Sequence, residues 1–141
     1  MNIDSIHNGF VIDHIPAGCG MKLYNLLGLD ELDCSIALIK NVPSRKMGKK
    51  DIIKIDAAIE LNLDLIGFFA PDVTVNIIRD SELVEKKSIA LPALLTGVIR
   101  CKNPRCITSC EQELAHKFKL TDAENHVYRC IYCETKASKE Q

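Results

Sequence analysis

Four cysteines near the C-terminal end of the chain have the spacing of metal ligands. Cys101 and Cys106 form a C-x4-C pair, and Cys130 and Cys133 form a C-x2-C pair. Two close pairs, each on a tight turn, suit a single tetrahedral zinc ion with four thiolate ligands. Four thiolates fill the coordination sphere and leave no position for water or substrate. We therefore expect one zinc ion with a structural rather than a catalytic role.

Disulfide bonds are the alternative use of such cysteine pairs. The chain begins with MNIDSIHNGF, which has no apolar signal-peptide core, and no apolar run has the length of a membrane span. We therefore expect a cytoplasmic, reducing location, where paired cysteines favour metal. Cys110 lies four residues after Cys106 and could compete as a ligand. The turn chemistry of Asn103-Pro104 favours the set without Cys110.

Composition limits the other functions. The net charge of −1 and the 5% of aromatic residues, with no Trp, do not indicate a nucleic-acid surface or an anionic membrane as partner. Neither G-x-x-x-x-G-K-[ST] nor G-x-G-x-x-G is present, and no nucleophile stands in a recognisable catalytic motif. A zinc-ribbon nucleic-acid-binding protein remains the alternative. Residues 95–141 hold eight Lys or Arg and six Asp or Glu, and four thiolates with Zn2+ would add about −2, so this domain is close to neutral, whereas a phosphate-tracking surface should be more basic.

A basic cluster, RKMGKKDIIK, covers residues 45–54. It predicts either an anion site, with phosphate as the anion, or a solvated loop. Lys54 lies within an alternating strand pattern, on the same face as Ile52 and Asp56. Because a lysine on a sheet face either meets solvent or holds a ligand, this residue favours a small-anion or nucleotide site.

Asp13 and His14 lie within the apolar strand pattern FVIDHI. Simple alternation puts neighbouring side chains on opposite faces of a strand. Both residues can touch one ligand only if the strand bends or ends there, which Pro16 permits.

Hydrophobic patterning predicts a regular order of elements before residue 92. We expect a loop over 41–50, helices over 21–27 and 62–69, with Asn62 as a cap, and strands over 9–15, 34–40, 51–57, 73–78 and 82–86. The order strand, helix, strand, strand, helix, strand indicates an α+β fold. It is typical of a ferredoxin-like antiparallel sheet with two helices on one face.

The remainder of the chain predicts a small zinc ribbon. Residues 97–100 and 126–129 would lead as short strands into the two cysteine turns. We expect two domains, 1–92 and 97–141, joined by a connector over 91–97. The second domain has too few residues for a robust core alone, so zinc should help to hold it together.

Several stretches together resemble one known family. GFVIDHIPAG, NVPSRKMGKKDIIKID and APDVTVNII, followed by the two cysteine pairs, resemble the regulatory chain of aspartate carbamoyltransferase. The resemblance runs in order from Ile3 to Glu134 and so covers nearly the whole chain.

This resemblance implies a regulatory subunit without catalytic activity of its own. Its ferredoxin-like domain would bind nucleotide effectors, with CTP, alone or with UTP, as inhibitor and ATP as activator. Its zinc domain would dock on the catalytic chain. Six regulatory chains, as three dimers, would link two catalytic trimers and regulate pyrimidine biosynthesis.

The resemblance also implies roles for individual residues. The zinc ligands would be the four cysteines that the spacing selects. Asn103, Glu111 and Glu134 would face the catalytic chain. His14 and Lys86 would lie at the phosphates of the nucleotide, Asp13 and Lys54 near its ribose and base, and Ile3, Asp4, Ser5 and Ile6 would flank the base. The full nucleotide site would comprise Val11, Asp13, His14, Lys50, Ile52, Lys54, Asn76, Ile78, Leu83 and Lys86.

Overall fold

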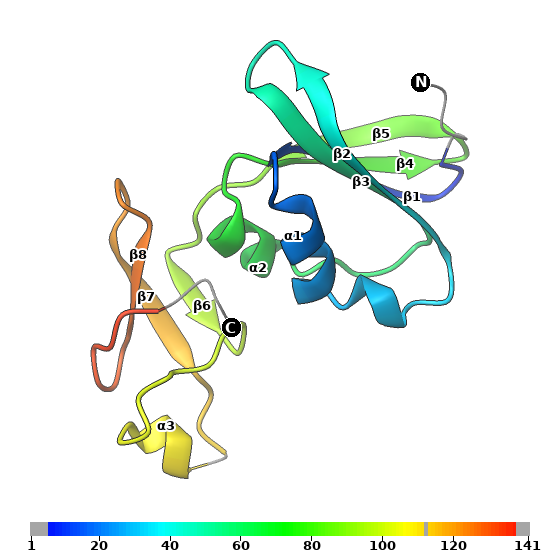
Figure 1. Ribbon diagram of the computed structural model, residues 1–141. Coiled ribbons are helices and arrows are strands. Elements are labelled where there is room, and N and C mark those ends of the chain that lie inside the picture. The colour runs from blue at the N-terminus through cyan, green and yellow to red at the C-terminus, as the bar shows by residue number, and fades with distance from the viewer. Residues whose placement is uncertain (1–5, 112, 138–141) are drawn as a thin grey trace.

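The computed structural model describes residues 6–111 and 113–137. The first part of the chain forms a five-stranded sheet in the order β2-β3-β1-β4-β5, and all neighbouring strands are antiparallel. These strands are β1 (Gly9–Pro16), β2 (Ser35–Ser44), β3 (Gly48–Asp56), β4 (Thr74–Arg79) and β5 (Glu82–Ser88). The helices α1 (Gly20–Leu26) and α2 (Leu63–Phe69) lie on one face of the sheet (Figure 1), and a short 3-10 helix, η1 (Leu29–Glu31), follows α1. This is the predicted ferredoxin-like arrangement, with β5 added at one edge.

Alternation along the strands explains which face the helices cover. Ile12 on β1 lies opposite Ile53 on β3 and Val75 on β4, and all three side chains are buried. They pack in one cluster with Leu23 of α1 and Ile66 of α2. Apolar side chains at every second strand position therefore form the helix-covered face, and the residues between them point to the other face.

Helix α2 begins as the sequence predicts. The side chain of Asn62 accepts a hydrogen bond from the Leu65 amide at 3.1 Å, which confirms Asn62 as the cap. Gly67 within α2 allows another segment of the chain to pack closely against the helix. A Cβ atom at this position would lie 2.7 Å from the Ala90 carbonyl oxygen, so a larger residue would push that segment away.

The predicted loop over 41–50 is wrong. Strands β2 and β3 continue through most of it and pair at Val42 with Lys50 and at Ser44 with Gly48. The pairing shifts register beyond Ile39, next to Asn41, whose φ of 59° is left-handed. Pro43 has no amide hydrogen to donate, but it lies on β2, an edge strand of the sheet, where such a donor is not required.

One buried carboxylate holds this irregular region together. Asp51 is fully buried and accepts hydrogen bonds from the amides of Gly18 and Gly20 at 3.1 and 2.9 Å, and from the Asn41 amide at 3.0 Å. The entry to α1 and the irregular part of β2 are thus fixed to β3 by a single side chain. The sequence pattern placed Asp51 at the start of a strand and gave no indication of this role.

The second part of the chain forms a three-stranded antiparallel sheet, β6-β7-β8. It consists of β6 (Leu94–Thr96), β7 (Lys117–Asp122) and β8 (Val127–Cys130), together with a one-turn helix, α3 (Ile107–Cys110). Strand β6 lies within residues 91–97, which were expected to form a connector. Residues 97–100 were expected to form a strand, but they form no regular secondary structure. No helix in the described part of the chain is long and apolar enough to cross a membrane.

Helix α2 also joins the two sheets through a second apolar cluster. Its Leu65 and Phe68 pack with Leu95, Phe118 and Tyr128 of the second sheet. The rings of Phe68 and Tyr128 meet edge to face, with centroids 5.3 Å apart and an interplanar angle of 71°. The Tyr128 hydroxyl donates to the Pro92 carbonyl at 2.5 Å, and burial, with a smaller contribution from Asp64, raises the pKa of this tyrosine.

We predict that Asp51→Ala strongly destabilises the chain. Three amide donors would lose their acceptor in a buried site, at about 1–3 kcal/mol each. The free energy of unfolding, measured in urea by circular dichroism, should therefore fall by about 3 kcal/mol or more. Asp33→Ala, which removes an exposed carboxylate, is the control and should change it by less than about 0.5 kcal/mol. Equal stability of the two variants would contradict the assignment.

Candidate functional site

The first cysteine pair lies on a turn that Asn103 shapes. The Asn103 carbonyl accepts from the Cys106 amide at 3.0 Å and from the Ser109 hydroxyl at 2.8 Å. Its side chain accepts from the Arg105 amide at 3.0 Å. Asn103 therefore holds the loop between Cys101 and Cys106 in a shape that turns both thiols to the same side, in agreement with the turn chemistry expected from the sequence.

The second pair lies on a turn that follows β8. The Cys130 carbonyl accepts from the Glu134 amide at 2.8 Å, and the Cys130 amide donates to the Thr135 carbonyl at 3.0 Å. Glu134 has a left-handed φ of 63°, which lets the chain reverse immediately after Cys133. Both pairs are thus presented by backbone-bonded turns.

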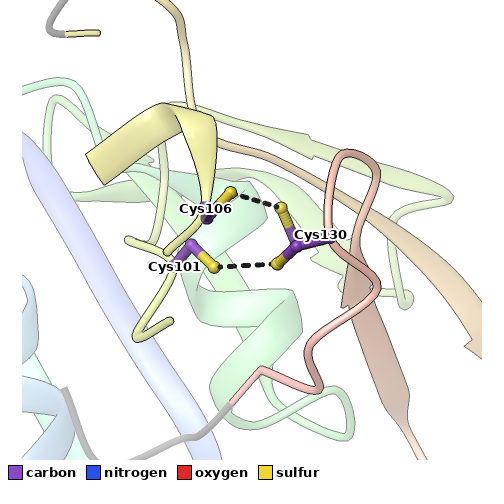
Figure 2. Close-up of side chains that lie close together, drawn as sticks. Cys101, Cys106 and Cys130 are labelled. Atoms are coloured by element: carbon purple, nitrogen blue, oxygen red, sulfur yellow. Dashed lines mark hydrogen bonds between the residues drawn. The ribbon is translucent and has the colours of Figure 1, made fainter. Parts of the chain in front are cut away.

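The four thiols converge on one point. Their sulfur atoms all lie within 4.8 Å of one another. Cys106 and Cys130 are 3.7 Å apart, as drawn in Figure 2, and Cys101 and Cys133 are 3.5 Å apart. A tetrahedron with Zn–S bonds of about 2.3 Å has edges of about 3.8 Å, whereas a disulfide requires about 2.05 Å. The sulfur geometry therefore fits a zinc ion and not a disulfide, and all seven cysteines are free.

The local surroundings shift the pKa values of the cysteine thiols in different directions. Burial raises the pKa of Cys101 to about 12 and also raises the pKa of Cys130. A hydrogen bond to the Thr135 hydroxyl, at 3.1 Å, instead lowers the pKa of Cys133 to about 6. Because zinc binds thiolates, its binding must displace protons from the buried cysteines and must weaken as the pH falls.

Cys110 is not part of the cluster. It is exposed at the end of α3, outside the group of four sulfur atoms. The four ligands Cys101, Cys106, Cys130 and Cys133 complete a tetrahedron without it, which leaves no open coordination position. The four cysteines form a site for one structural zinc ion.

A second polar arrangement crosses the uncovered face of the larger sheet. Lys54, Val11, Asn76 and Lys86 lie directly opposite one another on β3, β1, β4 and β5. The adjacent row of Ile53, Ile12 and Val75 is buried on the helix side, so this row faces away from the helices. Ile78 and Leu83 form the next pair on the same face.

Two irregularities bring further residues to this face. On β1, Asp13 and His14 together span the single residue Ile52 of β3, and His14 has a left-handed φ of 61°. On β5, the register shifts at Val84, which puts Leu83 and Lys86 on one face although they are three residues apart. Neither bulge could be predicted from the alternation of apolar and polar residues in the sequence. Pro16 did correctly indicate where β1 ends.

Asp13 and His14 form a small charged cluster with Lys50. The Lys50 ammonium lies 2.9 Å from one carboxylate oxygen of Asp13, and His14 Nδ1 lies 4.0 Å from the other. Burial alone would raise the pKa of Asp13, but the hydrogen bonds from Lys50 and from the His14 amide outweigh it and lower the pKa. Asp13 is therefore ionised and orients Lys50 at the end of the face.

Two buried polar atoms on this face have no hydrogen-bond partner in the described part of the chain. They are His14 Nδ1 and the side-chain oxygen of Asn76. A buried polar atom without a partner is costly, and such atoms in native proteins call for an explanation such as an external ligand. Asn76 lies opposite Val11, which in turn lies opposite Lys54, and His14 follows Asp13 further along β1.

Comparison with known proteins assigns the chain to a family. The family model for the aspartate carbamoyltransferase regulatory chain, allosteric domain, matches residues 1–90, and the model for its metal binding domain matches residues 94–141. The chain belongs to the aspartate carbamoyltransferase regulatory chain family. The regulatory chains of Clostridium botulinum strain Hall and Clostridium acetobutylicum are each 48% identical over 134 residues, which is 95% of this chain and 92% of theirs. That of Bifidobacterium longum is 43% identical over 137 residues, 97% of this chain and 99% of its own.

The resemblance also implied residues that flank the base of the nucleotide and residues that face the catalytic chain. Ile3, Asp4 and Ser5 fall outside the described residues, and Ile6 is buried. Asn103 is half-buried in the cysteine turn, whereas Glu111 and Glu134 are exposed beside the metal site.

Sequence reasoning missed the apolar surface around the metal centre. Ile107 follows the ligand Cys106, and Ile131 and Tyr132 follow the ligand Cys130. All three side chains are exposed, at 50%, 44% and 42%. The sequence did contain a signal for this exposure, because these residues come directly after zinc ligands and a tight turn cannot bury every side chain beside its ligands.

We predict that Cys106→Ser abolishes stoichiometric zinc binding, whereas Cys110→Ser retains one zinc per chain. The first substitution removes a buried thiolate from the set of four, and the second removes an exposed thiol outside the tetrahedron. Zinc content after dialysis, measured by atomic absorption, distinguishes the two variants. Urea unfolding should show the loss of stability only in Cys106→Ser, because binding free energy contributes to folding in such small modules. Loss of zinc from the Cys110 variant would refute this ligand set.

Proposed function

We propose that the chain is a non-catalytic regulatory subunit that binds nucleotide effectors on the uncovered sheet face and passes their effect to catalytic chains of aspartate carbamoyltransferase. The observation that carries this proposal is the row of Lys54, Val11, Asn76 and Lys86 across β3, β1, β4 and β5, together with the buried polar atoms of Asn76 and the nearby His14 that have no partner in the described part of the chain. Membership of the regulatory chain family supports it. CTP, UTP and ATP are the proposed effectors, and pyrimidine biosynthesis is the pathway under control.

The chemistry of the face suits a nucleoside triphosphate. Lys86 and His14 supply groups that can meet phosphate oxygens, and Lys54 and Asp13 can meet the ribose and the base. The buried oxygen of Asn76 can accept from a base amino group, and His14 Nδ1 can bond to a phosphate or a hydroxyl. Val11, Ile52, Ile78 and Leu83 supply apolar contact for the rings, and Lys50 is held in place by Asp13.

The proposed division of labour follows the two sheets. Residues 1–92 would form the effector domain and residues 97–141 the zinc domain. The zinc domain would dock on the catalytic chain through Asn103, Glu111 and Glu134 together with the exposed Ile107, Ile131 and Tyr132. An apolar patch beside charged residues, on turns fixed by metal, is the kind of surface that protein partners cover.

The proposed assembly contains six regulatory and six catalytic chains in the cytoplasm. Regulatory chains would pair through the edge strand β2, whose outer backbone groups can extend the sheet into a second copy. The effector can act on a remote active site only by binding two states of the assembly with different affinity.

We predict that Lys86→Ala weakens the binding of CTP and ATP by tenfold or more, because a charge-assisted contact is worth about 1.5–3 kcal/mol. Lys87→Ala is the matched control. Lys87 is the next lysine on β5, but it lies opposite Val75 in the row of the helix-covered face, so its loss should change affinity less than about twofold. Isothermal titration calorimetry on the zinc-loaded chain measures both. Equal weakening by both substitutions would indicate only a non-specific charge effect.

We also predict that the zinc-loaded chain associates with catalytic trimers of aspartate carbamoyltransferase from the same source. Sedimentation velocity should show a complex far heavier than the trimer. Removal of zinc by a chelator should abolish the complex, because the docking turns are held by the metal. The Cys110→Ser variant should associate normally. Failure of the fully loaded chain to associate would contradict the proposed function.

A further inference from the structure

His116 stands directly before β7 and holds two points of the segment that leads to the metal. Its carbonyl accepts from the Gly97 amide at 2.8 Å, and its ring atom Nδ1 accepts from the Cys101 amide at 3.0 Å. One residue therefore fixes both ends of the stretch from the end of β6 to the first zinc ligand. Gly97, at the start of this stretch, has a left-handed φ of 69°. The hydrogen bond from its amide to His116 helps to hold this turn in place.

The bond to Cys101 differs from those at the other ligands. The Cys106 amide donates to Asn103 and the Cys130 amide donates to Thr135, and both acceptors are backbone carbonyls within the ligand's own turn. The amide of Cys101 instead donates to a side chain 15 residues away. Because Nδ1 accepts this bond, the imidazole is neutral and carries its proton on Nε2.

We propose that His116 is a positioning residue of the metal centre, which orients Cys101 through its amide so that the thiol meets the other three. Groups that orient metal ligands typically contribute tenfold to hundredfold to metal affinity. Cys101 needs such help because, unlike Cys106 and Cys130, it is only half-buried, and it precedes its turn rather than lying inside it. Sequence motifs cannot reveal this role, because His116 lies between the two cysteine pairs without ligand spacing.

His116 also lines a cavity between the helices α1 and α2 and the segment that leads to the metal. This cavity has a volume of about 360 Å³, and its wall includes Leu65 and Phe68 of α2 as well as residues 97–100. His116 thus bonds to the metal loop and also lines a cavity that α2 borders. A side chain in this place can keep the metal loop in register with the helix that joins the two modules.

Asparagine and leucine substitutions separate hydrogen bonding from packing. In His116→Asn, the amide oxygen can occupy the place of Nδ1 and accept from the Cys101 amide, whereas His116→Leu fills the space without an acceptor. We expect zinc affinity, measured by competition with a colorimetric chelator on the full chain, to fall at least tenfold in His116→Leu and to return within about threefold of wild type in His116→Asn. His126→Asn is the control, because it changes the other histidine of this module at a left-handed φ of 55° that Asn tolerates.

Either of two results would overturn the proposal. One is wild-type zinc affinity in His116→Leu, and the other is equal weakening in the Asn and Leu variants. The wild-type chain provides a test that does not depend on how the variants fold. Imidazole ¹⁵N chemical shifts of the zinc-loaded protein should show a neutral ring protonated on Nε2, and the Cys101 amide should exchange slowly with solvent. A ring protonated on Nδ1 at neutral pH would equally refute the assignment.

Discussion

The convergence of four thiols on one point is the constraint on which the second half of the molecule depends. From β6 to residue 137, the described part of the chain has three short strands and a single turn of helix, which is too little to form a stable core alone. Two of its buried core residues, Cys106 and Cys130, are themselves ligands. The metal therefore closes this core and also fixes its shape, and the apolar patch beside the ligands is presented in a defined geometry only while the tetrahedron is intact.

Irregularity in the strands makes the polar face of the larger sheet. A regular β1 would direct Asp13 and His14 to opposite faces, and a regular β5 would do the same with Leu83 and Lys86. The bulge at His14 and the register shift at Val84 remove this separation, at the cost of a left-handed backbone at His14. The helix-covered face keeps strict alternation because it must bury Ile12, Ile53 and Val75. Regular pairing thus supports the core, and local departures from it collect polar groups on the opposite face.

This contrast explains what could be predicted from the sequence. The zinc ligands were predictable because a C-x4-C and a C-x2-C pair encode a local turn and a fixed metal geometry. The helix α2 and its cap at Asn62 were predictable for the same local reason. The hairpin over 41–50 was not, because its pairing depends on Asp51 accepting from residues 10 to 33 positions away. Lys54 was noticed from the strand pattern, but the full set of residues on the polar face came from family resemblance, since alternation alone would have separated His14 from Asp13 and Leu83 from Lys86.

Coupling between the polar sheet face and the metal module, as proposed above, would have a physical route through α2. Asn76 on the polar face is the neighbour of Val75, which packs in one apolar cluster with Ile66 of α2. The adjacent Leu65 and Phe68 belong to the second cluster, together with Tyr128 and two of the zinc ligands. A two-turn helix that contributes to both cores cannot shift in one without disturbing the other, because close-packed interiors transmit strain.

The segment between the two sheets is attached to the same helix and sheet. The Ala90 carbonyl packs closely against Gly67 of α2, and the Tyr128 hydroxyl donates to the Pro92 carbonyl. A ligand on the sheet would therefore influence the metal module to the extent that it changes the packing of α2.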